Sequence, residues 1–416
     1  MNENNWLYIE PFVYICVNTQ KALLYNTLNG KLIECLRGTK TYLLIKQLND
    51  DKNLLVIKLP SNYQKNKEIS GFVKNIREFY CGDVLTLPEN ATKPFQLKPI
   101  FNIQHDLKIM KESESVSVGT KIMQKLTSIT IQINSICDLT CCDCCNYNRQ
   151  FLFCTKKTSE ELHLKLIKKI LDNLGGSYIK AINVIGGNVF KYSKFDEFIN
   201  ILKVSNIVAS FFIHYQNIIK CDKFINSLSN NEFSVNILVN FPIDIDKLKS
   251  AKHLLENNNI NIKYIFIVES EKNCIFVENL INEMKIENNF TLLPFYNEKN
   301  LSFFCDNIFP ERNDILDAKP EISNIYARQV INSNYYGKLM IMSSGDVFAN
   351  LNEKKLGNIN SGTLHEFAYK EMKSGNSWRK TRKNVKPCNQ CIYKYLCPSI
   401  SNYEYAIGKF NLCNII

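Results

Sequence analysis

The sequence has no apolar run long enough to cross a membrane, and it has only five histidines in 416 residues. Apolar runs such as Tyr264–Val268 are far shorter than the roughly 20 residues that a bilayer requires. Met1–Asn5 has no basic segment and no long apolar core follows it, so we expect no secretory signal peptide. No persuasive His/Glu pair indicates acid–base catalysis. Because no apolar run can span a bilayer, we expect no membrane partner.

Cysteine, by contrast, is plentiful: the chain has 16, together with a formal net charge of +11 from 51 basic and 40 acidic side chains. Without an export signal, so many cysteines argue against a disulfide scaffold and favour metal or cluster ligation in a reducing cytoplasm. The positive charge is spread along the chain, so nucleic acid is not the expected partner, although an acidic peptide would be attracted. The length predicts two or three domains.

Five of the cysteines fall within residues 137–145, directly after the apolar stretch 129–133. Three of them have the spacing C-x3-C-x2-C: Cys137, Cys141 and Cys144. Three thiolates from one short loop can reach three corners of a cubane and leave the fourth iron open, which makes it a place for chemistry. Cys142 and Cys145 offer other registers, but no other triplet has this spacing.

Between about 120 and 330, apolar stretches alternate with helical ones. The expected strands cover 128–134, 179–185, 208–214, 234–239, 262–268 and 290–295. The expected helices include 195–204, 245–256 and 276–284, and one that opens at a capping box, Thr158-x-x-Glu161, and continues to Leu174. This alternation predicts a parallel sheet wrapped by helices, with a site at the carboxyl ends of the strands.

A second group of cysteines follows an expected hairpin at 339–349. Its pattern is C-x2-C-x5-C-P plus one distal cysteine: Cys388, Cys391, Cys397 and Cys413. Four thiolates can ligate one cubane completely or hold a structural zinc, and the loop at 137–145 favours iron–sulfur. The basic run Lys370–Lys386 is interpreted as a solvated face, with contact to an acidic substrate as the alternative.

The C-x3-C-x2-C loop and the βα alternation resemble the radical S-adenosylmethionine (radical SAM) superfamily. The resemblance implies an α/β fold with a partial (β/α)6 TIM-like barrel. It also implies that Cys137, Cys141 and Cys144 hold a [4Fe–4S] cluster whose open iron binds S-adenosyl-L-methionine (SAM). Reductive cleavage of SAM would give a 5′-deoxyadenosyl radical that takes a hydrogen atom from a bound peptide, with a flavodoxin or ferredoxin type of protein as electron donor.

Two SAM-contacting segments of that superfamily are altered here. The family usually has Gly-Gly-Glu-Pro after the second strand, and this chain has Gly186, Gly187, Asn188 and Val189. Two glycines permit close backbone approach, and the Asn188 amide oxygen would share the amino group of SAM with backbone carbonyls. A plain turn is the alternative. Asp143 stands where the family usually packs an aromatic residue on the adenine, and no Gly-x-Ile-x-Gly-x-x-Glu motif follows the fifth strand.

Residues 331–416 resemble the SPASM extension of radical SAM peptide maturases, which uses seven cysteines for two auxiliary clusters. Non-cysteine residues occupy the positions of one of these clusters: Ser343 or Ser344, Asn350 and Ser401. The cysteines that remain all belong to the other cluster. The resemblance therefore implies one auxiliary [4Fe–4S] cluster, held by Cys388, Cys391, Cys397 and Cys413.

The first 110 residues predict two strands, 12–17 and 22–26, then a helix, 40–48, a strand, 54–59, and a helix, 69–80. This order resembles the winged-helix domains that recognise the leader of a ribosomally made precursor peptide by adding it as an edge strand. An accessory or dimerisation domain is the alternative. With a linker edge near 112–118, the expected domains are 1–110, 120–330 and 331–416.

Together these patterns identify the chain as a radical SAM peptide maturase that modifies a precursor peptide, with a cysteine thioether cross-link as the first expectation. A non-catalytic pseudo-radical-SAM partner that binds the precursor and a cluster is the main alternative, and the altered positions Asp143 and Asn188 favour it. A sulfatase-maturing type of enzyme is a third possibility. The missing second cluster and the peptide-binding-like N-terminal unit count against that third possibility.

Overall fold

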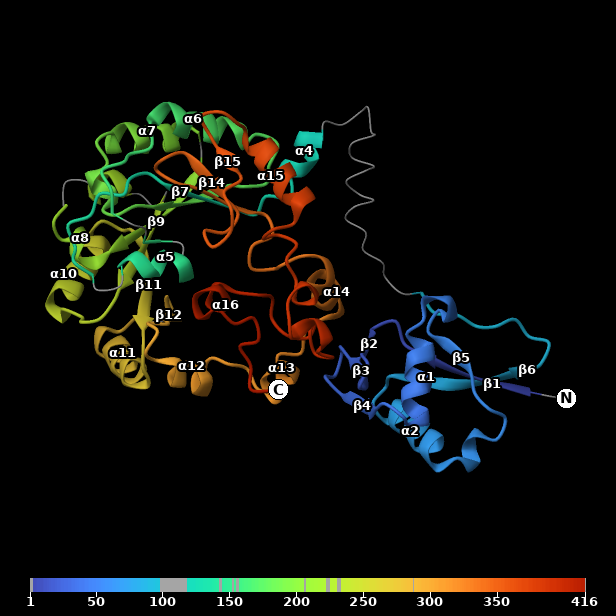
Figure 1. The fold of residues 1–416 in the computed structure, drawn as a ribbon. Coiled ribbons are helices and arrows are strands. Elements are labelled where there is room, and N and C mark those ends of the chain that lie inside the picture. The colour runs from blue at the N-terminus through green and yellow to red at the C-terminus, as the bar shows by residue number, and fades with distance from the viewer. Residues whose placement is uncertain are drawn as a thin grey trace.

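A computed structural model gives the fold of the chain (Figure 1). It describes residues 3–97, 118–141, 144–151, 153–154, 157–205, 207–221, 225–229, 233–286 and 288–415. The expected linker edge at 112–118 therefore lies almost wholly outside the described residues, as does Asp143. Within the described ranges, no helix has the length and apolar character needed to cross a bilayer.

The largest element is a mixed sheet of nine strands in the order β12-β11-β10-β9-β8-β7-β13-β14-β15. Its strands are β7 (Ser128–Gln132), β8 (Ala181–Ile185), β9 (Val208–His214), β10 (Phe233–Val239), β11 (Asn261–Val268), β12 (Phe290–Pro294), β13 (Lys338–Ile341), β14 (Asp346–Phe348) and β15 (Gly357–Asn358). Neighbours from β12 to β13 pair in parallel, and β14 and β15 are added antiparallel. The fold is thus mixed α/β.

The six expected strands of the central region are confirmed as β7 to β12, each to within two residues at either end. The expected hairpin also exists as β13 and β14. It is not a separate unit, however, because β13 pairs in parallel with β7, Lys338 opposite Ser128 and Ile341 opposite Ile131. The C-terminal region therefore supplies strands to the same sheet that carries the cysteine loop.

The two faces of this sheet have different coverings, because side chains alternate along each strand. In β11, Phe266 points into the core beneath the outer helices, whereas Ile265 and Ile267 face the inner side with Phe295 and Tyr147. Figure 1 shows α6, α7, α10 and α11 along the outer side, and α5 and α16 on the inner side. The helices of this part are α4 (Val118–Met123), α5 (Cys144–Gln150), α6 (Leu164–Asn173), α7 (Phe195–Val204), α8 (Tyr215–Ile218), α10 (Ile245–Asn257), α11 (Glu271–Met284) and α12 (Leu301–Asn307).

One expected helix start is wrong: α6 begins at Leu164, not at Thr158. The segment before it runs along the end of β7 instead, since the Leu162 N–H donates to the Ile133 carbonyl at 2.8 Å. Glu161 does not cap a helix; its carboxylate accepts the Ser193 N–H at 2.9 Å. Pairing with the residues that follow β7 overrides the local capping pattern.

The N-terminal part has its own hydrophobic core and two antiparallel sheets of three strands, in the orders β5-β1-β6 and β2-β3-β4. The expected strands and helices are present, and β1, β4 and β6 are additional. The elements are β1 (Glu3–Ile9), β2 (Val13–Val17), β3 (Lys21–Asn26), β4 (Leu32–Leu36), α1 (Lys40–Leu48), β5 (Val56–Lys58), α2 (Lys67–Glu78) and β6 (Gly82–Pro88).

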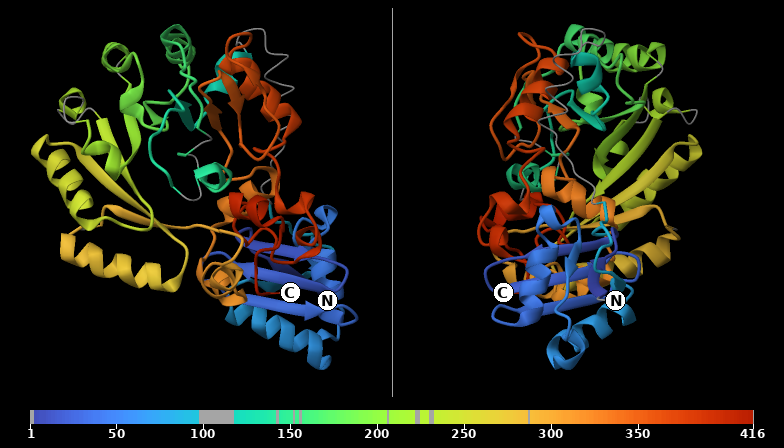
Figure 2. Two further views of the ribbon diagram at one scale, coloured as in Figure 1. Left: turned by 60° about the vertical axis from the view of Figure 1, so that its left-hand side comes forward. Right: turned by 90° about the vertical axis from the view of Figure 1, so that its right-hand side faces the viewer.

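The β2-β3-β4 sheet packs against the C-terminal cysteine segment, and Figures 1 and 2 show the two side by side. Tyr14 and Tyr25 share a buried cluster with Ile392 and Leu396. Polar contacts also cross this interface: Arg312 Nη2 lies 2.8 Å from Glu34 Oε1, the Tyr393 hydroxyl donates to the same oxygen, and Asn18 Nδ2 donates to the Gln390 carbonyl at 2.6 Å. The remaining helices are α13 (Arg312–Asp317), α14 (Ile322–Val330), α15 (Leu364–Ser374) and α16 (Asn402–Ile407).

The basic run 370–386 is only partly the solvated face that the sequence predicts. Trp378 is fully buried, and Glu371 beneath it accepts the Trp378 N–H at 2.8 Å. The side chain of Arg382 is 11% exposed and pairs with Glu404, which is 3% exposed. A count of charges cannot tell Arg382 and the half-buried Arg379 and Lys380 from exposed residues of the same run such as Lys383 and Lys386.

Candidate functional site

The first cysteine group, called here the three-cysteine loop (Cys137, Cys141 and Cys144), starts just after β7. Cys137 and Cys141 are half-buried and close enough for the charge of one to affect the other. Burial raises the pKa of Cys137, whereas a bond from the Leu139 N–H and the charge of Lys157 oppose that rise. Cys144 is the first residue of α5, and residues 142–143 lie outside the described ranges.

The two glycines after β8 lie directly against this loop. A Cβ on Gly187 would collide with the Ile136 carbonyl and lie 2.8 Å from Cys137 Cβ. A Cβ on Gly186 would lie 2.8 Å from Asn134 Oδ1. The Gly-Gly pair is therefore required for close contact between the ends of β7 and β8, which is more than a simple turn needs.

Replacing Gly187 by alanine is expected to displace the cysteine loop. The added methyl group has no room, and overpacking of this kind costs about 1–3 kcal/mol. We expect a lower midpoint of thermal unfolding together with reduced iron uptake. Gly71→Ala is the matched control, because nothing lies within 4 Å of its Cβ position and alanine favours the α2 helix. Equal iron uptake in both variants would show that the contact is not needed.

Asn188 has a structural role in the described geometry. Its side-chain oxygen accepts the Phe190 N–H at 3.1 Å and caps a short 3₁₀ turn, Val189–Lys191. Its own N–H donates to the Ile136 carbonyl at 2.6 Å, and its carbonyl accepts Asn134 Nδ2 at 2.8 Å. The residue is 3% exposed. Its assignment to the amino group of SAM stays a prediction, and the amide oxygen already has a donor.

Sequence reasoning missed a series of hydrogen-bonded polar side chains at the carboxyl ends of β9 and β10. His214 ends β9, and its Nδ1 accepts the Gln216 N–H at 3.3 Å. Its Nε2 must then carry the proton and donate to Asn240 Oδ1, 2.6 Å away, just after β10. Asn240 Nδ2 in turn donates to the Tyr147 hydroxyl of α5 at 3.4 Å. A single histidine gives no spacing pattern, so only the fold can reveal this series of hydrogen bonds.

His214 should make the stability of the chain fall in mild acid. Burial lowers its pKa from 6.5 to about 4, and the bond to Asn240 only partly opposes this shift. The unfolded state binds a proton below pH 6.5 and the folded state does not until about pH 4. The stability from neutral His214 is therefore complete above pH 6.5 and falls by about 1.4 kcal/mol per pH unit between these values. Urea unfolding at several pH values should show this slope, and His214→Gln should reduce it.

Helix α5 is fastened to the far edge of the parallel sheet. Gln150 Nε2 donates to the Tyr296 carbonyl at 2.8 Å, and the Tyr296 N–H donates back to Gln150 Oε1 at 2.9 Å. Phe151 stacks on Phe153 at 5.2 Å between ring centroids, and Cys141 packs against the same inner cluster. The cysteine loop thus borders an apolar, aromatic lining rather than a polar cleft.

The second group, called here the four-cysteine group (Cys388, Cys391, Cys397 and Cys413), comes from the segment 388–397 and from one cysteine close to residue 416. Burial raises the pKa of Cys391, and the nearby Cys388, Cys413 and Cys16 thiols raise it further. Burial also raises the pKa of Cys397 to about 12; the charge of Arg382 opposes this rise, and Cys391, Cys413 and Cys388 add to it. The mutual effects of these thiols place Cys388, Cys391, Cys397 and Cys413 in one partly buried region.

Arg382 links the segments that carry this group. Its Nε donates to the Pro398 carbonyl at 2.6 Å and its Nη1 to the Phe410 carbonyl at 3.2 Å. Nη1 also lies 3.7 Å from Cys388 Sγ, and Nη2 bonds Glu404 at 2.9 Å. One buried guanidinium therefore ties the chain before Cys388, after Cys397 and before Cys413. Its positive charge beside thiols suits an anionic ligand set.

Oxygen and nitrogen donors occupy the positions of the expected missing cysteines. The buried Ser343 N–H donates to Gln132 Oε1 at 3.2 Å, and the Asn350 side chain accepts the Asn352 N–H at 2.9 Å. Ser401 caps α16, with its hydroxyl on Glu404. The Asn350 and Ser401 side chains already serve as a hydrogen-bond partner and a helix cap, the Ser343 bond uses its backbone N–H, and none of the three side chains is a thiolate.

The donor set of each group fits an iron–sulfur cluster chemically, since thiolates are its usual ligands. In the part of the chain that the structure describes, no three Cys, His, Asp or Glu side chains yet converge as metal ligands. In the four-cysteine group, the Cys388 thiol instead donates to the Phe410 carbonyl at 3.2 Å. Ligation would require it to turn from that carbonyl to its neighbours.

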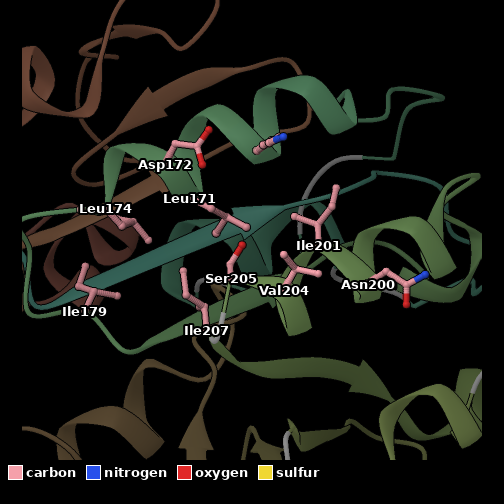
Figure 3. Close-up of a pocket in the computed structure, with 11 residues that line it drawn as sticks. Leu171, Asp172, Leu174, Ile179, Asn200, Ile201, Val204, Ser205 and Ile207 are labelled. Atoms are coloured by element: carbon pink, nitrogen blue, oxygen red, sulfur yellow. The ribbon is translucent and has the colours of Figure 1, made fainter.

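A groove of about 640 Å³ lies beside helices α6 and α7 (Figure 3). It is bordered by the ends of α6 and α7 and by the starts of β8 and β9. Leu171, Leu174, Ile179, Ile201 and Val204 give it an apolar wall. Because the cysteine loop follows the opposite ends of the strands, this groove has no part in the candidate site.

No protein-family model matches the chain, and no curated protein matches it either. Among solved structures, SuiB of Streptococcus suis bound to S-adenosylmethionine is similar at 14% identity and a TM-score of 0.47, over 98% of each chain. SuiB bound to the precursor peptide SuiA is 14% identical with a TM-score of 0.49, over 98% of this chain and 100% of SuiB. These scores are too low to carry an argument, so the functional conclusion rests on the residues themselves.

Proposed function

We propose that the chain is a radical SAM enzyme that modifies a ribosomally made precursor peptide. The observation that carries this proposal is the position of the C-x3-C-x2-C loop. It follows β7 in a run of seven parallel strands and is packed against the Gly186–Gly187 pair at the end of β8. Carboxyl ends of parallel strands are where α/β folds place their chemistry.

Cys137, Cys141 and Cys144 would hold a [4Fe–4S] cluster, which when bound supplies the electron for reductive cleavage of SAM. The chain's own residues would do the rest. Gly186 and Gly187 let the backbone come close to the methionine end of SAM. The aromatic lining around Phe151, Phe153 and Phe295 would exclude water and other hydrogen donors from the reacting carbon.

Cys388, Cys391, Cys397 and Cys413 would hold a single auxiliary [4Fe–4S] cluster, with Arg382 offsetting its negative charge. The region 331–416 would thus be a SPASM-type region with one auxiliary cluster instead of two, and 120–330 a partial (β/α)6 barrel whose sheet is continued by β13. We also propose a cytoplasmic location, since 16 cysteines suit a reducing compartment. A flavodoxin or ferredoxin would supply electrons.

The N-terminal region, 1–110, would recognise the precursor peptide in the manner of a winged-helix domain. Its two small sheets have outer strands, β4 and β6 among them, to which an extended peptide could add. The net charge of +11 would attract an acidic leader. The modification that we propose is a cysteine thioether cross-link.

Anaerobic reconstitution with iron and sulfide tests this proposal. The protein should take up about eight irons, as expected for two cubanes, and form 5′-deoxyadenosine from SAM and dithionite. About four irons without 5′-deoxyadenosine would contradict the enzyme, provided that Cys388→Ala removed those four. Mass spectrometry of a co-expressed precursor would then test for the loss of two hydrogens that a thioether requires.

The non-catalytic partner remains the second candidate because of one specific observation. Asn188 presents a neutral amide in place of the family's glutamate, and its oxygen already accepts the Phe190 N–H. In that case the chain would bind the precursor peptide and the auxiliary cluster and assist another maturase. The same reconstitution separates the two candidates.

A further inference from the structure

The two cysteine groups are connected by one short helix, α16. Glu404 in its first turn uses one carboxylate oxygen for Arg382, at 2.9 Å, and the other for the Ser401 N–H, at 2.8 Å. The carboxylate that caps α16 is therefore the same one that holds the guanidinium beside Cys388 Sγ. Any change that moves Arg382 must disturb the start of this helix.

The opposite side of the same helix turn holds α5. Asn402 Nδ2 donates to the Gln150 carbonyl at 3.2 Å, at the end of α5. The Tyr403 hydroxyl donates to the Pro294 carbonyl at 2.7 Å, where β12 ends, and its ring meets Phe151 edge-on at 6.5 Å. These contacts fix the helix that begins at Cys144.

Asn402 is itself held rigidly by neighbours from the C-terminal region. Its Oδ1 accepts the Tyr335 hydroxyl at 2.8 Å and Asn352 Nδ2 at 3.0 Å. Asn352 Nδ2 also donates to the Arg149 carbonyl of α5 at 2.7 Å. A contiguous set of hydrogen bonds thus runs from Cys388 through Arg382, Glu404 and α16 to the last turn of α5.

We infer that α16 transmits the state of the four-cysteine group to α5, so that ligation at Cys388 orders the helix that begins with Cys144. Asn402, Tyr403 and Glu404 are positioning residues in this view. Cys388 must leave the Phe410 carbonyl to ligate a metal, and Arg382, which contacts both Cys388 Sγ and that carbonyl, would carry the change to Glu404. The inference rests on metal binding by the four-cysteine group, which is part of the proposed function, but it does not need SAM cleavage.

The test measures amide hydrogen exchange in α5 rather than activity. All samples are full-length chains carrying Cys141→Ala, so that the three-cysteine loop cannot protect α5 through a cluster of its own. With the four-cysteine group loaded with iron and sulfide, the α5 amides should exchange about fivefold more slowly than in the metal-free chain. That factor corresponds to one hydrogen bond of ordinary net strength.

Three variants locate the path. Asn402→Ala and Tyr403→Phe should each bring the loaded chain close to the metal-free exchange rate while its iron content is unchanged. Tyr405→Phe is the matched control. It also removes a hydroxyl group from α16, but that hydroxyl bonds Glu353 at 2.8 Å and is not bonded to α5 or β12. This control should keep the full protection. Protection that survives Asn402→Ala would overturn the inference.

The outcomes also separate this inference from the proposed function. Iron uptake at the four-cysteine group with equal α5 exchange in loaded and metal-free chains would overturn the inference alone. Failure to take up either iron with sulfide or Zn²⁺ would overturn both the inference and the auxiliary cluster. Slower exchange without any 5′-deoxyadenosine in the unmutated chain would uphold the inference and count against the enzyme.

Discussion

Cys141→Ala is expected to abolish 5′-deoxyadenosine formation and to lower the iron content from about eight to about four atoms per chain. Cys141 is the middle member of the only triplet with the x3/x2 spacing, and it packs at the edge of the apolar inner cluster. The loss removes one ligand of three, while the four-cysteine group keeps all its thiols. Iron analysis and chromatography of the nucleoside product check both parts.

Cys142→Ala is the control for this prediction, since it removes the adjacent thiol and leaves the triplet intact. It should retain about eight irons and most of the product. If Cys142→Ala were as inactive as Cys141→Ala, the ligand assignment would have to move to another register. If Cys141→Ala kept its product, the three-cysteine loop would not be the site.

Arg382→Met should be the most destabilising change in the C-terminal region. It would leave Glu404, 3% exposed, without its cation and would free the Pro398 and Phe410 carbonyls. Breaking a buried pair by removing one partner costs about 3–5 kcal/mol. We expect a clear fall in the urea midpoint, lower iron retention at the four-cysteine group and faster proteolysis after residue 331.

Two further variants serve as comparisons for Arg382→Met. Arg382→Met combined with Glu404→Leu replaces both charges by apolar groups and should recover part of the loss, as buried pairs often allow. Arg37→Met removes an exposed arginine and should change the stability by no more than about 0.5 kcal/mol. An equal loss of stability at Arg37 and Arg382 would show that the buried pair contributes no more to the free energy of unfolding than an exposed arginine does.

The central strands could be predicted from the sequence because parallel strands that are buried on both faces consist of short apolar runs. Gly186 and Gly187 were also readable, since two adjacent glycines after a strand predict close backbone approach. The start of α6 was not, because Thr158 and Glu161 satisfy a local capping pattern that pairing with the end of β7 overrides. Local helix-capping patterns predict poorly where the same backbone groups can instead pair with residues at the end of a strand.

The chain of contacts around Arg382 was hidden for another reason. In sequence it is one of several basic residues between 370 and 386, and burial is a tertiary property that charge patterns do not encode. His214 and Asn240 were missed because each is a single polar residue at the end of its own strand. Only the parallel register of β9 and β10 brings them together.

The pairing of β13 with β7 has a consequence for how this chain can be made and divided. β7 has β8 on one side, but its other edge stays bare until residues near Lys338 have been synthesised. A fragment that ends before 338 would expose an open apolar strand edge, the kind that promotes aggregation. The C-terminal region is therefore not a detachable module. Replacing the C-terminal region by that of another protein would succeed only if the incoming piece also brought a strand of matching register.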